Sequence, residues 1–193
     1  MALTFGATVG AIIILLGEHS GAVINPALTL AAASARLLKG NFVIPYIVFQ
    51  TAGGILAGLT LRIVFAPFGD TTSLGSTKLA ASINPITGIT LEALGTFVLA
   101  VSALAATAWV SRTSVQGLIV GGMLTILILF IGPLTGAGFN PARSLGPALA
   151  SEYFSNLYVY VVGPVVGALF AGLLFRFAPR KTLVRVREAC NES

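Results

Sequence analysis

One short sequence occurs twice in this chain, and it constrains the fold more than any other feature. Residues 20–30 read SGAVINPALTL and residues 135–145 read TGAGFNPARSL, with Gly, Ala, Asn, Pro, Ala and Leu at matching positions 115 residues apart. A second pair, AGGILAGL from residue 52 and VGALFAGL from residue 166, is 114 residues apart. Self-similarity at one offset predicts that the chain consists of two related halves.

The composition places both halves in a membrane. Hydrophobic residues make up 56% of the chain and charged residues 9%, whereas about a quarter of the residues of a globular domain are charged. Segments near the roughly 20 residues that a spanning helix needs are residues 1–16, 42–61, 89–110, 115–131 and 157–177. Two shorter apolar segments, 24–38 and 139–149, contain Asn-Pro near their start and are expected to be half-helices. We therefore expect an all-α membrane protein with five full transmembrane helices and two re-entrant half-helices.

The expected organisation is a single domain over residues 1–193. It consists of an incomplete first repeat (about 1–65), a connecting loop (66–88), a second repeat (89–177) and a basic tail (178–193). The loop is rich in Gly, Ser, Thr, Asp and Pro, which favour turns. The net charge of +5 comes largely from the C-terminus, and the positive-inside rule explains it as a cytoplasmic tail better than nucleic-acid binding does.

Several other classes of protein fit the sequence poorly. A signal peptide at residues 1–16 is disfavoured because the segment starts without Lys or Arg. The single cysteine, Cys190, excludes an internal disulfide, and the single histidine, His19, cannot by itself form a metal site. The chain has no Ser-His-Asp set and no phosphate-binding glycine loop, so we expect no enzyme activity, no metal and no cofactor.

The two Asn-Pro pairs indicate what the half-helices do. Asn is a favoured N-cap and Pro is well placed at the first helical position, so helices are expected to start at Asn25-Pro26 and Asn140-Pro141. Non-helical backbone at membrane depth is tolerated only in protein or beside a wet cavity, so residues 20–24 and 135–139 must line such a cavity. Inverted repeats would bring the two helix N-termini together near the midplane. Their positive dipole ends and the two Asn amides would favour a neutral polar solute over a cation.

Only the second copy carries a charge after its Asn-Pro-Ala, Arg143 in place of Leu28. A charged residue at membrane depth is costly and is functional by default. Its guanidinium offers hydrogen-bond donors and no acceptor, which suits a constriction that excludes cations.

With these motifs the chain resembles the aquaporin or major intrinsic protein family, and in particular its archaeal branch, over nearly all of its length. The resemblance implies an inverted-repeat helical bundle that assembles as a homotetramer with one pore in each subunit. It implies a multi-pass protein of the cell membrane that passively conducts water. Glycerol, other small neutral solutes and dissolved gases are further candidate solutes, and protons and ions would be excluded.

The resemblance also assigns roles to particular residues. The two pore motifs would be Asn25, Pro26 and Ala27, and Asn140, Pro141 and Ala142. The selectivity filter would be Phe5, Ile128, Ala137 and Arg143, and the backbone lining the pore would be Gly21, Ala22, Val23, Gly136 and Gly138. Glu92 would accept hydrogen bonds from the second pore loop.

Some positions at and near the filter depart from strict water channels. Ile128 stands where those channels usually have His, so the filter is expected to be more apolar and less strict. Ser144, where glycerol channels typically have Asp, favours water, and Tyr160 agrees with water channels whereas Val161 does not.

Two alternatives remain open. A secondary transporter also uses inverted repeats and broken helices, but it needs a coupling site, and this chain has only one intramembrane acid, Glu92. A non-conducting truncated family member is the other alternative. The repeat offset places the counterpart of residues 89–110 before Met1, so we expect a functional chain to have roughly 25 more residues, with an apolar span that carries a Glu.

Overall fold

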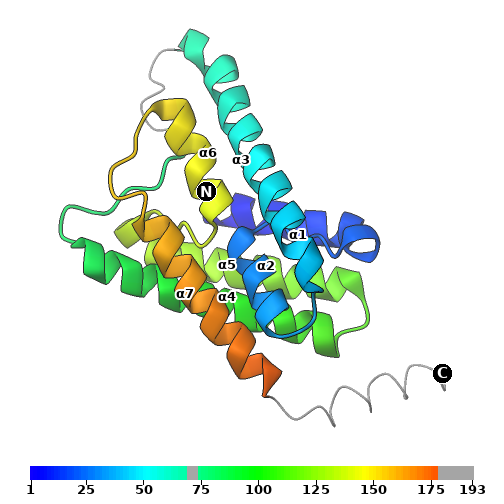
Figure 1. Cartoon of the computed structure of the whole chain (residues 1–193). Helices are drawn as coiled ribbons and strands as arrows, with labels where there is room; N and C mark the ends of the chain where they lie inside the picture. The colour runs from blue at the N-terminus through cyan, green and yellow to red at the C-terminus, as the bar shows by residue number, and fades with distance from the viewer. Residues whose placement is uncertain (69–73, 178–193) are drawn as a thin grey trace, which may run out of the picture.

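The fold is that of a helical membrane protein, and the computed structural model describes residues 1–68 and 74–177 of it. Every regular element in these two ranges is a helix (Figure 1). The predicted basic tail, 178–193, and Cys190 within it lie outside the described residues.

Five helices are long and apolar enough to cross a membrane, as predicted from the sequence. They are α1 (Ala2–Ser20), α3 (Val43–Phe65), α4 (Pro85–Trp109), α5 (Thr113–Thr135) and α7 (Val159–Arg176). The two half-helices are α2 (Pro26–Ser34), of 9 residues, and α6 (Pro141–Ser151), of 11 residues. Two short 3-10 helices, η1 (Gly40–Phe42) and η2 (Ala66–Phe68), flank α3.

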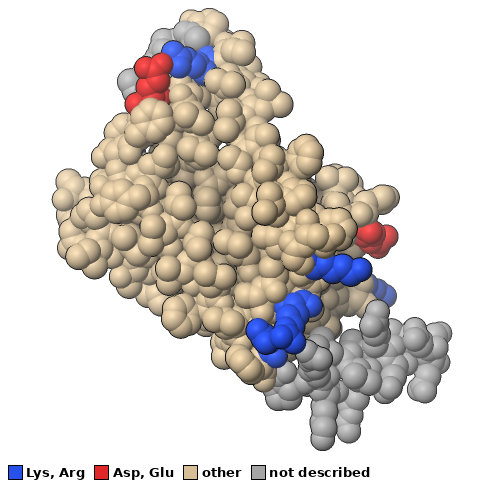
Figure 2. Space-filling model, in the orientation of Figure 1, with Lys and Arg blue, Asp and Glu red and all other residues tan. Residues whose placement is uncertain are grey.

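Figure 2 shows charged side chains at opposite ends of the visible face, with an uncharged band between them that suits lipid.

Most helix boundaries differ from the expected ones by a few residues, and two of the differences have a clear local basis. The connecting segment ends before residue 85, not at residue 88, because a third Asn-Pro pair starts α4 there. The Asn84 side chain accepts a hydrogen bond of 2.9 Å from the backbone N–H of Thr87, which is an ordinary N-cap. The first half-helix ends at Ser34 rather than at residue 38, and Arg36 follows with a left-handed φ of 60°.

The two halves of the chain interlock rather than lie side by side. α1 of the first half packs along α5 of the second half. Each half-helix packs against the last spanning helix of the other half, α2 against α7 and α6 against α3, and α6 lies along α3 in Figure 1. This exchange brings the starts of α2 and α6 into the middle of the molecule.

Small residues allow these helices to approach closely. A Cβ added to Gly54 on α3 would lie 2.5 Å from the carbonyl oxygen of Ala142 on α6, and one added to Gly146 would collide with the backbone of Gly54. Glycines make similar contacts between α1 and α5, where Gly10 faces Gly117. In lipid the hydrophobic effect contributes little to the association of helices. Van der Waals contacts between closely packed backbones are therefore a main source of stability.

Two neighbouring glycines on α3 provide a matched test of this packing. Gly54→Ala should destabilise the protein by about 1–3 kcal/mol, because the new methyl group forces α3 away from α6. Gly53→Ala should be neutral or slightly stabilising, since an added Cβ there meets nothing within 4 Å. Heat unfolding of the two purified variants in detergent measures the difference. Equal midpoints would contradict the close contact between α3 and α6.

Candidate functional site

Each half-helix begins with the same local arrangement. The Asn25 side-chain oxygen accepts a hydrogen bond of 2.9 Å from the N–H of Ala27, and that of Asn140 accepts one of 3.0 Å from the N–H of Ala142. The following prolines occupy the first helical positions, where a backbone N–H would have no partner within the helix. The sequence prediction of two Asn-Pro helix starts is therefore confirmed.

The two asparagines also tie the halves together by crossed hydrogen bonds. The side-chain nitrogen of Asn25 donates to the carbonyl of Phe139 (2.8 Å), and that of Asn140 donates to the carbonyl of Ile24 (3.1 Å). Each amide thus caps its own half-helix with its oxygen and holds the opposite loop with its nitrogen. An amide nitrogen has two N–H groups, so these crossed bonds use one of the two on each asparagine.

The second loop, residues 135–139, is held by the buried carboxylate of Glu92 on α4. Its oxygens accept hydrogen bonds from the Thr135 hydroxyl (2.6 Å) and from the N–H groups of Gly138 (2.9 Å) and Phe139 (2.7 Å). A carboxylate accepts several hydrogen bonds at once, so it suits a loop whose N–H groups have no helical partner. The expected supporting position of Glu92 agrees with this geometry.

The first loop, residues 20–24, is held by groups that the sequence interpretation missed. The Tyr46 hydroxyl donates to the carbonyl of Ser20 (2.9 Å), and the Gln50 side chain donates to the carbonyl of Val23 (2.6 Å). Tyr160 makes the matching bond in the other half, to the carbonyl of Thr135 (2.7 Å). Tyr46 and Tyr160 are 114 residues apart, so the repeat offset would have paired them.

Both loops turn through left-handed backbone. Ala22 and Ala137 occupy matching positions with φ of 47° and 49°, and each follows a glycine with φ of 71° or 82°. Left-handed backbone is uncommon for residues other than glycine and persists only where the surroundings hold it. The carboxylate, tyrosine and glutamine contacts described above provide that support.

A cavity of about 380 Å³ lies where the two half-helices meet. It is lined by both pore asparagines and by all four residues expected to form a filter, namely Phe5, Ile128, Ala137 and Arg143. The guanidinium carbon of Arg143 lies 5.2 Å from the centre of the Phe5 ring, within the range of a cation–π contact. The structure therefore brings residues from α1, α5, the second loop and α6 into one space.

A second cavity, of about 240 Å³, continues from the first. It contains Gly21, Ala22 and Val23 in its lining, and it shares Val9, Ile24, Leu28 and Val120 with the first cavity. Gly138 lines the first cavity, whereas Gly136 lines neither and instead packs against the backbone of Thr77 and Lys78. Because the two cavities share lining residues, they adjoin each other, and we call the two together the central path.

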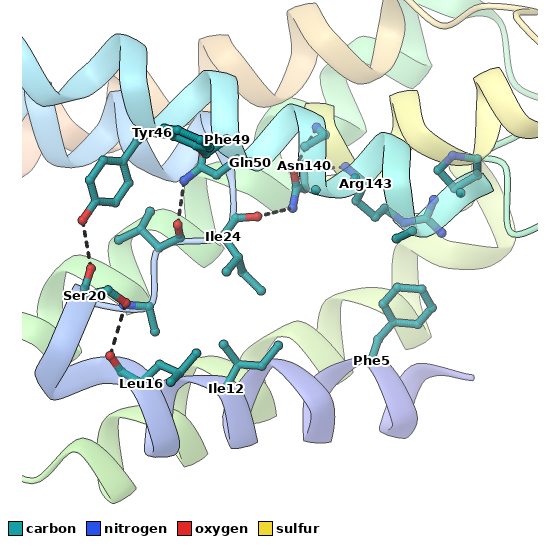
Figure 3. Close-up of a pocket in the computed structure, with 18 of the residues that line it drawn as sticks. Phe5, Ile12, Leu16, Ser20, Ile24, Tyr46, Phe49, Gln50, Asn140 and Arg143 are labelled. Carbon is teal, nitrogen blue, oxygen red and sulfur yellow. Dashed lines mark hydrogen bonds between the residues drawn. The ribbon is translucent and has the colours of Figure 1, made fainter. Parts of the chain in front are cut away.

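A third and larger cavity, about 740 Å³, lies beside the central path. Figure 3 shows it between α1, which carries Phe5 and Ile12, and α3, which carries Tyr46 and Gln50. It shares Phe5, Ile12, Ile24, Asn140 and Arg143 with the first cavity and Ser20, Ala22, Val23, Ile24 and Tyr46 with the second. Because its remaining lining is mostly apolar and the smaller cavity holds both asparagines, the central path is the better candidate site.

Across residues 1–68 and 74–177, no three His, Cys, Asp or Glu side chains come together in a way that could hold a metal ion. The polar groups of the central path include amides, hydroxyls and the guanidinium of Arg143, which can bind and orient a small polar molecule.

Comparison with known proteins points to one family. The model of the family described as "Major intrinsic protein" matches residues 1–175. Aquaporin NIP3-1 of Arabidopsis thaliana is 36% identical over 199 residues, a match that covers 100% of this chain and 62% of the relative. The probable aquaporin AqpM of Archaeoglobus fulgidus is 35% identical over 186 residues, covering 93% of this chain and 76% of the relative.

A solved structure supports the fold. The aquaglyceroporin from Plasmodium falciparum superimposes with a TM-score of 0.81 at 20% sequence identity, covering 92% of this chain and 81% of that one. The chain spans less than two thirds of the length of several plant relatives, 62% for NIP3-1 and 63% for NIP2-1 of Arabidopsis thaliana.

The role of Glu92 can be tested by removing one of its acceptors. Glu92→Gln should destabilise the protein by about 2–3 kcal/mol, because an amide NH₂ would face N–H donors of the second loop and leave one unpaired. The readout is the midpoint of heat unfolding in detergent. Glu18→Gln is the control, since Glu18 is exposed and its side chain accepts only a long hydrogen bond of 3.3 Å from Thr113. If both variants unfold at the wild-type temperature, Glu92 does not hold the loop.

Proposed function

Because the chain belongs to the major intrinsic protein family, we propose that it is a passive transmembrane channel for water and small neutral solutes. It would reside in the cell membrane as a multi-pass protein, which its five long apolar helices support. The relatives are named aquaporins, so conduction rather than catalysis is the activity proposed.

The observation that carries this proposal is the pair of half-helix N-termini in one cavity. Each N-terminus contributes a partial positive charge, and each asparagine retains one N–H for a passing oxygen. A water molecule or a hydroxyl group can accept those bonds while it crosses. A cation cannot, and it also meets two repelling dipoles and the charge of Arg143.

Phe5, Ile128, Ala137 and Arg143 are the proposed selectivity filter. Their shared lining of the central path supports this assignment, and Arg143 is the charged residue among those that line the cavity. Ile128 offers no polar group to a solute, so the filter would admit glycerol beside water. Dissolved gases and other small neutral solutes are further candidates for the same path.

A homotetramer with one pore in each subunit is the proposed assembly. Its support is the family to which the chain belongs. Native mass spectrometry of the detergent-solubilised protein tests this, and a monomer at every detergent concentration would count against it.

Osmotic shrinkage of proteoliposomes tests the function. Vesicles that contain the protein should shrink faster in a sorbitol gradient than protein-free vesicles, without a need for an ion gradient. Shrinkage at the lipid rate would support a non-conducting family member. Solute movement that depends on a proton or sodium gradient would instead support a coupled transporter.

Arg143 supplies the sharpest test of the filter. Arg143→Val should leave a water pore but weaken the exclusion of cations and larger solutes, because it removes the fixed charge beside the constriction. The measurement is flux of water, glycerol and protons in the same proteoliposome preparation. If the Arg143→Val channel still excludes cations and larger solutes as well as the wild type does, the assignment of Arg143 to the filter is wrong.

Ile128 tests the proposed solute range. The wild-type channel should pass glycerol measurably, and Ile128→His should lower glycerol flux relative to water flux by narrowing the filter and adding a polar group. Glycerol flux through the wild-type channel at the rate of bare lipid would rule out this range. Ile126→His is the control, because Ile126 is 49% exposed on the same helix and does not line the central path.

A further inference from the structure

Residues 74–80 lie against the second half-helix and the loop before it. The carbonyl of Gly75 accepts a hydrogen bond of 2.8 Å from Nη1 of Arg143, and the hydroxyls of Ser76 and Ser151 lie 2.7 Å apart. The N–H of Ala80 donates to the carbonyl of Leu134 (2.9 Å) at the end of α5. We call residues 75–80 the strap.

The strap supplies a hydrogen-bond acceptor to Arg143 from outside α6. The guanidinium also lies over the Phe5 ring on α1, so it is placed between a carbonyl on one element and an aromatic face on another. A hydrogen bond to a charged donor is strong and directional. The position of the Gly75 carbonyl therefore decides where the charge of Arg143 sits in the central path.

The Ser76–Ser151 contact has a defined direction. The Ser151 hydroxyl donates its proton to the carbonyl of Pro147 (2.8 Å), so it is an acceptor for Ser76. Ser76 follows Gly75 directly, and Ser151 is the last residue of α6, whose first turn carries Arg143. The hydroxyl pair thus connects the residue after the Gly75 carbonyl to the helix that carries the guanidinium.

Other contacts also hold the rest of the strap. Thr77 is buried, and the Lys78 ammonium lies 4.6 Å from the centre of the Tyr153 ring. These contacts should hold the strap against the rest of the protein when the Ser76–Ser151 hydrogen bond is removed. Loss of the bond should therefore move the Gly75 carbonyl without unfolding the surrounding structure.

We propose that Ser76 and Ser151 are positioning residues for the selectivity filter, which act by fixing the Gly75 carbonyl that holds Arg143. This inference rests on the proposed channel function. Without the bond, Arg143 would leave its place for part of the time and the constriction would widen. Losing one hydrogen bond of ordinary strength shifts such an equilibrium by about fivefold.

Flux measurements in proteoliposomes test the effect on selectivity. Ser76→Ala and Ser151→Ala should each raise the ratio of glycerol flux to water flux by about fivefold, whereas Ser76→Thr, which retains the hydroxyl, should not. Ser102→Ala is the control, because Ser102 is a half-buried serine of α4 whose hydroxyl donates to the carbonyl of Val98 in its own helix. A wild-type ratio in both alanine variants would overturn the proposal.

A double variant separates positioning from a general structural role. If Ser76 acts through Arg143, adding Ser76→Ala to Arg143→Val should change the flux ratio no further than Arg143→Val alone. Full additivity of the two changes would show that Ser76 acts elsewhere and would overturn the proposal.

A chemical readout makes the test independent of conduction. Phenylglyoxal should modify Arg143 about fivefold faster in Ser76→Ala than in the wild type, measured by peptide mass spectrometry relative to the exposed Arg112. If the wild-type vesicles do not conduct and Arg143 still reacts faster in the variant, the proposed function fails and the positioning role stands. An unchanged modification rate overturns the positioning role.

Discussion

Backbone N–H and C=O groups need partners inside a membrane, and this requirement explains most of the structure around residues 20–24 and 135–139. Non-helical backbone at membrane depth costs several kcal/mol for each unpaired group. Here the two loops supply partners to each other, because the Asn25 amide donates to Phe139 and the Asn140 amide donates to Ile24. The same two bonds bring the half-helix N-termini together, so the candidate pore is a direct result of satisfying the loops.

The two halves share one of these contacts and differ in another. Tyr46 and Tyr160 each donate to the carbonyl at the start of their loop, whereas Glu92 accepts from N–H groups of the second loop and Gln50 donates to a carbonyl of the first loop. The asymmetry extends to the pore lining, where Arg143 matches Leu28 of the first half. The start of α6 therefore presents a charge to the central path, where the matching position of α2 has an apolar side chain.

Much of the fold could be predicted from the sequence. Composition and segment length predicted the five spanning helices, and the repeated Asn-Pro predicted both half-helices. The start of α4 at Asn84-Pro85 was missed, although the same cap chemistry applies there. It lies in a polar segment, where composition favoured a loop over a helix start.

The candidate site was predicted only in part. Residues grouped by resemblance do line one cavity, but the contacts that position them depend on tertiary structure. No local pattern marks the Gly75 carbonyl as a partner of Arg143, since 68 residues separate them. The repeated Asn-Pro motif also does not show that each asparagine donates one N–H to a carbonyl of the opposite loop, because this bond depends on how closely the two halves approach.

The central claim is that crossed amide bonds make the two loops one cooperative unit. Asn25→Asp tests it most directly, because the aspartate keeps the cap oxygen for Ala27 but has no donor for the Phe139 carbonyl. Backbone hydrogen exchange in detergent micelles should then accelerate over residues 135–139 as well as 20–24. Asn84→Asp, which alters only a cap, should leave both loops protected. Acceleration confined to residues 20–24 in Asn25→Asp would contradict the account.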